Sequence, residues 1–210
     1  MFVLPPCPDV VVSKSETVWN GRFPLERIHF RNRRFDGAMS GPRIWELWRR
    51  GKAAAYLPYD PVCGTVLLIE QFRLPALAAG LDPVLTELPA GLCDAGETPE
   101  ATIRRESVEE IGIAPGRLHH VGDFLLTAGG SDENCALFIG EIAAPVAGAD
   151  GIVGTGGLHA EEEDIRARLW RLDEATEAAL DGRIANSVAA IGLLWMAARG
   201  GWLRREWGFA

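Results

Sequence analysis

The most constraining feature of the sequence is an acidic segment, GLCDAGETPEATIRRESVEEIG, at residues 91–112. Thr98 is a good helix N-cap, Pro99 suits the first helical position, and Gly112 suits the residue that follows the last turn. The segment therefore predicts a helix over 98–111, and the rest of the fold must accommodate it.

One flank of this helix is apolar and the other is acidic. At 100° per residue, Ile103 and Ile111 fall on the same side as the small residue Ser107. The other flank carries three glutamates: Glu106, Glu109 and Glu110. Like charges three or four residues apart on a helix repel one another. The acidic flank is therefore either a solvated surface or the binding place of a cation.

The composition is that of a folded protein with a substantial core. The 210 residues suit one domain, or a main domain with a small appendage, and 48% of them are apolar. The formal net charge of −8 argues against general nucleic-acid binding, because that requires a basic face. No signal peptide and no apolar stretch long enough to span a bilayer is present. With four scattered cysteines, these features predict a cytoplasmic protein without a membrane partner.

Strand and helix patterns interleave along the chain without strict alternation. Strands are expected at 53–60, 65–74, 84–91, 122–130, 135–143 and 163–172. Further helices are expected at 173–181 and 184–199, with Gly200 and Gly201 as a natural stop. The pattern therefore predicts an α/β protein with a mixed sheet between helices.

The first fifty residues differ in charge from the remainder. Residues 20–50 hold eight arginines against three acidic residues. The segments 23–35 and 43–50 mix apolar and basic residues in a way that suits strands. We therefore interpret residues 1–50 as a small β-rich domain and residues 51–210 as the main domain.

The spacing within the acidic segment resembles the Nudix box. The matching residues are Gly91, Glu97, Arg105, Glu106, Glu109, Glu110 and Gly112. One apolar position of the motif holds Ser107 instead. The resemblance implies the Nudix α/β/α sandwich and a pyrophosphohydrolase that acts on phosphorus anhydrides. Gly91 and Gly112 would have structural roles, and Glu97 would form an ion pair with Arg105 or, alternatively, join a metal site.

The resemblance also implies Mg²⁺ or Mn²⁺ as the cofactor. These cations bind oxygen ligands, neutralise a diphosphate and polarise its phosphorus atoms. Glu106 and Glu110 would be direct ligands, and Glu109 would bind a further ion or its water shell. Ala90 would offer its backbone carbonyl.

Segments outside the motif are similar to the ADP-ribose pyrophosphatase and nucleotide-sugar branch of that family, over roughly residues 20–200. This similarity implies a homodimer whose N-terminal domains complete the substrate sites, with or without domain exchange. In this branch the catalytic base lies in a glutamate-rich loop, which indicates Glu163, with Glu161 as a possible substitute. The expected reaction converts ADP-ribose to AMP and ribose 5-phosphate.

Five residues are candidates for substrate binding on the same resemblance: Arg73, Phe23, Trp45, Ser131 and Glu133. Arg73 would approach the substrate, one of the aromatic side chains would stack on the nucleobase, and the loop at 127–133 would contact the distal sugar. Ala128 stands where ADP-ribose hydrolases usually carry a proline, so GDP-mannose or another nucleoside diphosphate sugar is the alternative substrate. A non-catalytic module that senses ADP-ribose is the second alternative.

Overall fold

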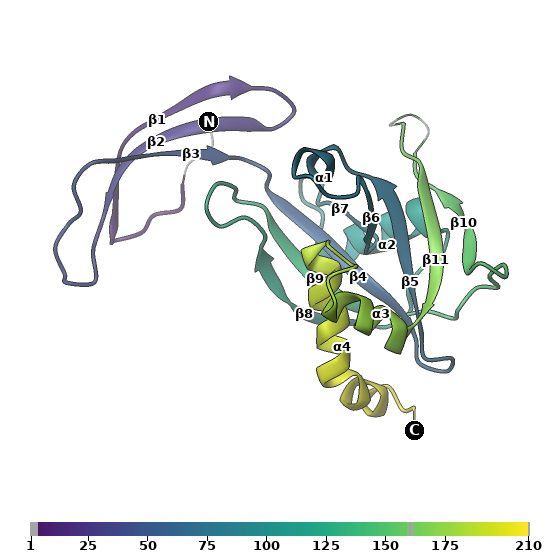
Figure 1. The fold of residues 1–210 in the computed structure, drawn as a ribbon. Helices are drawn as coiled ribbons and strands as arrows, with labels where there is room; N and C mark the ends of the chain where they lie inside the picture. The colour runs from purple at the N-terminus through teal and green to yellow at the C-terminus, as the bar shows by residue number, and fades with distance from the viewer. Residues whose placement is uncertain (1–3, 159, 161, 210) are drawn as a thin grey trace. The chain divides into compact units, whose positions relative to one another are not determined.

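The structure is a computed structural model that describes residues 4–158, 160 and 162–209. Contacts between Cα atoms divide the chain into two compact units (Figure 1). The first comprises the residues up to Gly51 and the segment Leu125–Glu133, and the second comprises Lys52–Phe124 and the residues from Asn134 onward. The loop at 125–133 therefore belongs with the N-terminal strands, although it lies far from them in sequence.

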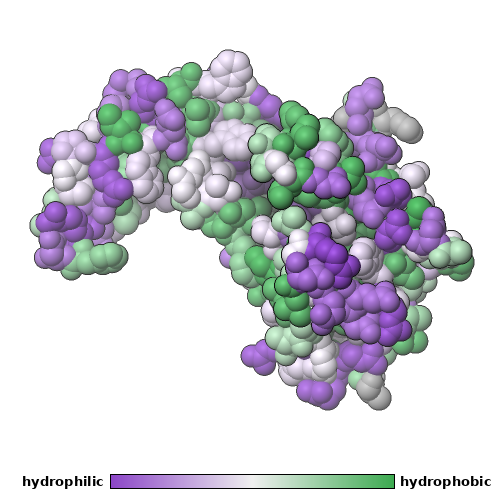
Figure 2. Space-filling view, viewed as in Figure 1, coloured by the Kyte–Doolittle hydropathy of each residue, from purple (hydrophilic) through white to green (hydrophobic). Residues whose placement is uncertain are grey.

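The first unit is built on a three-stranded antiparallel sheet. Its strands, in spatial order, are β1 (Val10–Asn20), β2 (Pro24–Asn32) and β3 (Arg43–Trp48). Several large apolar side chains of this sheet are exposed: Val11, Trp19, Ile44 and Trp45. Figure 2 shows hydrophobic residues among hydrophilic ones on the surface of this unit. The sheet thus buries little apolar surface within its own unit.

The second unit is organised around an eight-stranded mixed sheet. Its main path runs β10-β11-β5-β4-β9-β8, with β6 beside β5 and β7 beside β4. The strands are β4 (Lys52–Asp60), β5 (Thr65–Phe72), β6 (Val84–Glu87), β7 (Ala90–Leu92), β8 (Leu118–Leu125), β9 (Asn134–Glu141), β10 (Ile152–Gly156) and β11 (Ile165–Arg171). The helices are α1 (Leu74–Ala78), α2 (Pro99–Ile111), α3 (Leu172–Leu180) and α4 (Ser187–Glu206).

The central strand β4 is buried on both faces, which explains its nearly continuous apolar sequence. On one face, Tyr56 packs in a cluster with Ile103 of α2. On the other face, a Cβ added to Gly192 of α4 would lie 3.8 Å from the Cβ of Leu57. Because successive strand residues point to opposite faces, α2 and α4 cover opposite sides of the sheet. The predicted α/β/α sandwich with a separate N-terminal β sheet is confirmed.

Ser107, the departure from the apolar pattern of α2, has a specific partner. Its side chain is fully buried, and its hydroxyl donates to the carbonyl of Ile113 and hydrogen bonds the hydroxyl of Tyr56. The Tyr56 ring in turn lies so close to Gly140 that a Cβ there would be 2.5 Å from the ring. A small hydroxyl residue at 107 therefore satisfies a tyrosine that a larger apolar residue would leave unpaired.

The expected helix stop at Gly200 and Gly201 is wrong, because α4 continues to Glu206. Two glycines cost about 2 kcal/mol of helix propensity. Burial of Leu203 in the turn that follows offsets this cost. Gly200 itself is buried, with Met196 packed against it. Within the described residues no helix, α4 included, combines the length and apolar character that crossing a membrane requires.

Candidate active site

Helix α2 is held at both ends as its sequence predicts. The Thr98 hydroxyl accepts a hydrogen bond from the Ala101 N–H at 3.2 Å. At the other end Gly112 has a φ of 68°, a left-handed conformation that glycine adopts without steric cost. With Ile103 buried against the sheet, the acidic flank is fixed in direction.

Two of the three glutamates lie against the start of β7. The Ala90 N–H donates to Oε2 of Glu110 at 3.0 Å. A Cβ on Gly91 would lie 1.7 Å from Oε1 of Glu106, so only glycine leaves room for this carboxylate. Ala90 thus contacts Glu110 through its N–H, and the use of its carbonyl stays a prediction.

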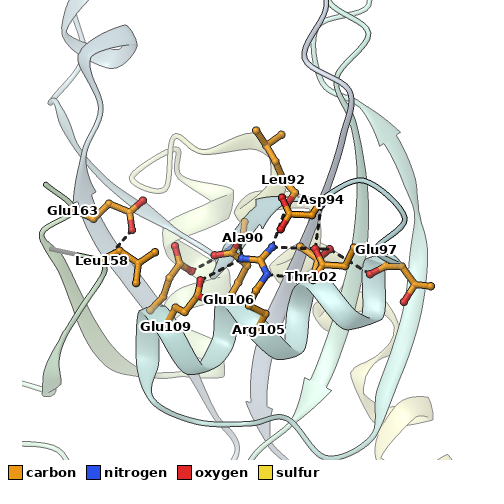
Figure 3. A network of polar contacts seen from close by, with 12 residues as sticks. Ala90, Leu92, Asp94, Glu97, Thr102, Arg105, Glu106, Glu109, Leu158 and Glu163 are labelled. Carbon is orange, nitrogen blue, oxygen red and sulfur yellow. Dashed lines mark hydrogen bonds and ion pairs between the residues drawn. The ribbon is translucent and has the colours of Figure 1, made fainter. Parts of the chain in front are cut away.

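Arg105 joins the loop before α2 to the acidic flank (Figure 3). Its guanidinium donates to both carboxylate oxygens of Glu97, at 3.2 and 3.0 Å. Its Nη1 lies 2.6 Å from Glu106 and 3.2 Å from Glu109. Glu97 also accepts bonds from the Asp94 N–H and the Thr102 hydroxyl. These contacts make Glu97 a loop-fixing residue in this structure.

The carboxylates differ sharply in electrostatic environment. Hydrogen bonds, first from Arg105 and then from the Asp94 N–H and Thr102, lower the pKa of Glu97 to about 2. Burial, together with the charges of Glu106 and Glu163, raises the pKa of Glu110 to about 8 despite the opposing hydrogen bond from the Ala90 N–H. Burial also raises the pKa of Glu106. Burial thus disfavours the charged forms of Glu106 and Glu110, which a bound cation would favour.

The donor set suits a hard divalent cation, although the side chains are not arranged around one. Among the described residues, no three acidic, histidine or cysteine side chains are placed so as to hold a metal ion. The reason lies in their present partners, since Arg105 pairs with Glu106 and Glu109 while Glu110 accepts the Ala90 N–H. Carboxylate oxygens are the ligands that Mg²⁺ and Mn²⁺ prefer. A cation would thus replace the contacts of Arg105 with the two glutamates.

We expect the metal-free protein to lose stability as the pH rises from 6.5 to 8. Because the folded pKa of Glu110 is about 8, against an ordinary value of 4.5, the folded state retains a proton that the unfolded state has released. This contribution is complete below the ordinary pKa and is lost as the pH rises through the folded pKa. Denaturant titrations in the presence of a chelator measure the free energy of unfolding across this range.

The contribution of His119 has the opposite sign and ends near neutral pH. Burial lowers the pKa of His119 from 6.5, so the protein gains stability as the pH rises through 6.5, and this gain is complete by about pH 7.5. The variant Glu110→Gln should show a flatter dependence between pH 6.5 and 8. An equal slope in the variant and the wild type would rule out Glu110 as its source.

Glu163, the candidate base, lies in a loop that folds back on itself. Its Oε2 accepts the Leu158 N–H at 3.2 Å, and its own N–H donates to the Leu158 carbonyl at 3.3 Å. The charge of Glu163 raises the pKa of both Glu106 and Glu110, so the three carboxylates share one electrostatic environment. The second candidate base, Glu161, lies outside the described residues.

Two glycines that the sequence analysis did not single out attach this loop to α2. The Gly157 N–H donates to the Glu109 carbonyl at 3.1 Å. A Cβ on Gly156 would lie 2.0 Å from the carbonyl oxygen of Glu110. The Gly-Gly pair just before the loop of Glu163 is the sequence signal, because glycines mark close backbone approach.

Arg73 is held by a buried glutamate. Its Nε and Nη2 donate to Glu87 at 3.1 and 2.9 Å. Glu87 was also missed from the sequence, where a charged residue within the apolar strand 84–91 was the available signal. The charges of Glu110 and Glu163 act on Arg73 as well, which connects Arg73 electrostatically with the acidic flank.

Two of the other substrate-binding candidates are engaged within the first unit. Arg50 forms an ion pair with Glu133 at 3.1 Å. Its guanidinium lies 4.2 Å from the centre of the Phe23 ring and 4.9 Å from that of Trp48. Glu133 and Phe23 therefore help to fix the loop at 125–133 to the strands.

Trp45 and the glycine-rich loop line an apolar groove of about 210 Å³ in the first unit. Trp45 is 49% exposed and packs edge-on against Phe30 at 5.4 Å between ring centres. Ala128 lies in the wall of the same groove. Ser131 is buried, and its hydroxyl accepts the Glu133 N–H. The structure thus brings Trp45 and Ala128 together, while Ser131 supports the loop.

Comparison with known proteins relates the whole chain to one group of enzymes. The NUDIX domain family matches residues 49–190. An "ADP-ribose pyrophosphatase" of Escherichia coli (strain K12) is 37% identical over 199 residues, covering 95% of this chain and 93% of that protein. A "GDP-mannose pyrophosphatase" of Pectobacterium atrosepticum is 34% identical, covering 87% of this chain and 91% of its own.

A solved structure has the same fold. The protein described as an "ADP compounds hydrolase" superposes with a TM-score of 0.63 and 18% identity, covering 94% of this chain and 99% of that chain. At this identity the match supports the arrangement of helices and strands alone.

Proposed function

Because the chain belongs to the NUDIX domain family, we propose that it is a hydrolase that cleaves ADP-ribose to AMP and ribose 5-phosphate. The observation that carries this proposal is the 37% identity to an ADP-ribose pyrophosphatase over 95% of the chain. The buried, closely spaced carboxylates of α2 support it, because together they can hold a divalent cation that neutralises a polyanionic diphosphate.

We propose Mg²⁺, or alternatively Mn²⁺, as the cofactor. Glu106 and Glu110 would hold it, the Ala90 carbonyl would add an oxygen ligand, and Glu109 would bind a further ion or the water shell. When bound, such an ion polarises a phosphoryl oxygen and stabilises the charge that develops in the transition state. Arg105 would then release Glu106 and Glu109 and keep its two hydrogen bonds to Glu97, which fix the loop before α2.

The remaining catalytic roles, activation of water and binding of the diphosphate, belong to side chains of the protein. The Glu163 carboxylate orients a water molecule and accepts its proton as the oxygen attacks one phosphorus of the substrate. Because a carboxylate accepts on two oxygens, the hydrogen bond from the Leu158 N–H to Oε2 leaves Oε1 for this proton. Arg73 binds the diphosphate through its guanidinium. Breaking the anhydride bond then leaves one phosphate on adenosine and one on ribose.

The first unit is proposed to complete substrate recognition in a homodimer. Phe23 or Trp45 would stack on the adenine, and Ser131 with Glu133 would contact the distal sugar. The exposed apolar residues of the β1–β3 sheet are consistent with an interface between two copies. A location in the cytoplasm stays a prediction.

GDP-mannose, or another nucleoside diphosphate sugar, is the second candidate substrate. Relatives described as GDP-mannose pyrophosphatases are 30–35% identical to this chain. Ala128, in place of the proline usual in ADP-ribose hydrolases, favours keeping this alternative. If GDP-mannose is the substrate, the residues that line the groove with Trp45 and Ala128 would accommodate guanine.

A substrate panel tests these proposals directly. The protein is incubated with Mg²⁺ and ADP-ribose, GDP-mannose, NADH or a diadenosine polyphosphate, and the products are separated by chromatography. AMP and ribose 5-phosphate from ADP-ribose, formed faster than GMP from GDP-mannose, are expected. Absence of nucleoside monophosphate from every substrate would instead indicate a module that binds ADP-ribose without cleaving it.

A further inference from the structure

Arg73 and Glu87 face one another across two paired strands. Strands β5 and β6 are antiparallel, with Phe72 opposite Val84 and Ile69 opposite Glu87. Residues directly opposite one another on two paired strands lie on the same face, and so do residues two positions apart along one strand. Arg73 follows Phe72 directly and its N–H donates to the Pro83 carbonyl at 2.6 Å, so the register continues through it. Its side chain therefore lies on the face that carries Glu87.

The two side chains are buried to very different extents. The Glu87 side chain is 7% exposed, whereas that of Arg73 is 44% exposed. A buried carboxylate is costly unless it is paired, and Arg73 pairs with it through two parallel hydrogen bonds of 3.1 and 2.9 Å. The buried partner thus fixes the exposed one.

The pair leaves Arg73 able to bind an anion. A guanidinium carries five N–H groups, of which Glu87 uses two. The charges of Glu110 and Glu163 act on the same guanidinium. Glu87 also stands three residues before Ala90, whose N–H holds Glu110. One short segment of chain therefore fixes both Arg73 and a carboxylate of α2.

We propose that Glu87 is a positioning residue for diphosphate binding, which holds the Arg73 guanidinium in one orientation toward the substrate. A flexible arginine would have to be ordered by the substrate itself, at a cost in affinity. The inference rests on the proposed function only in that the ligand is a nucleoside diphosphate sugar.

The test is a double-mutant cycle of Glu87→Gln and Arg73→Lys, with KM and kcat measured on ADP-ribose. Glu87→Gln should raise KM about tenfold and change kcat less than about threefold, because binding is lost in the ground and transition states alike. Arg73→Lys should raise KM about thirtyfold, since lysine cannot form the paired bonds. The double variant should be no worse than Arg73→Lys, because Glu87 acts through Arg73.

Two further variants separate positioning from a general structural role. Glu87→Asp keeps the buried charge and withdraws the carboxylate by about 1.5 Å, so it should raise KM while the protein folds normally. Glu141 forms a similar two-bond pair with Arg117, at 2.6 and 2.8 Å. Glu141→Gln should therefore leave KM unchanged, and it should cost less stability than Glu87→Gln because the Glu141 side chain is 24% exposed.

The outcomes distinguish this inference from the proposed function. If the KM increases of the two single variants multiply in the double variant, Glu87 does not act through Arg73 and the inference is wrong, while the proposed function stands. An unchanged KM in Glu87→Gln would have the same meaning. If the wild type does not cleave ADP-ribose, the same cycle is read from the dissociation constant of its α,β-methylene analogue, measured by calorimetry with Mg²⁺. A wild type that neither cleaves ADP-ribose nor binds the analogue would overturn both.

Discussion

Replacing Glu110 with glutamine is expected to lower the metal-dependent turnover of ADP-ribose by about 10³-fold while the protein stays folded. Burial of the Glu110 side chain explains both the loss of turnover and the retained fold. Because burial raises the Glu110 pKa to about 8, the metal-free protein at neutral pH already holds a mostly uncharged side chain at this position. Glutamine matches that state and can still accept the Ala90 N–H, but it offers a cation no negative charge.

Three measurements check this expectation: turnover, thermal stability, and Mn²⁺ affinity by calorimetry. Glu100→Gln is the matched control, because Glu100 lies in the first turn of the same helix and is exposed. It should behave like the wild type in all three. Metal-dependent turnover of Glu110→Gln within about tenfold of the wild type would contradict the assignment of Glu110 as a metal ligand.

The helix that carries the site could be predicted from the sequence because its determinants are local. The Thr98 cap and the Gly112 ending act within five residues of their own positions. The fold class followed from interleaved patterns of the same kind. The prediction failed at Gly200, where packing around Leu203 outweighs local propensity. Short elements such as α1 and β10 were also missed, since they contain too few residues for a periodic pattern.

The contacts within the site could not be predicted in the same way because they join distant residues. Glu87 lies 14 residues from Arg73, and its strand register decides that they meet. Arg105 was expected to pair with Glu97, but its additional contacts with Glu106 and Glu109 depend on side-chain directions. The motif spacing thus identified the residue types, whereas the partners of each charge required the structure.

Replacing Gly156 with alanine is expected to destabilise the protein by about 3 kcal/mol, at the upper end of overpacking effects. The added Cβ would lie 2.0 Å from the carbonyl oxygen and 2.6 Å from the carbonyl carbon of Glu110. These are backbone atoms of α2, which cannot turn aside as a flexible side chain can. Strand β10 must therefore move away from the helix, which weakens the bond between the Gly157 N–H and the Glu109 carbonyl.

Activity should fall further than stability alone explains, because the loop of Glu163 begins at this contact. A displacement of about 1 Å in a catalytic group costs roughly 100-fold in rate, so we expect a loss of that order in the fraction that remains folded. Gly154→Ala is the matched control. Gly154 lies in the same strand, opposite Ala167 as Gly156 is opposite Ile165, and no atom lies within 4 Å of its added Cβ. Thermal melting and single-turnover rates that are equal in the two variants would show that the approach of β10 to α2 does not position Glu163.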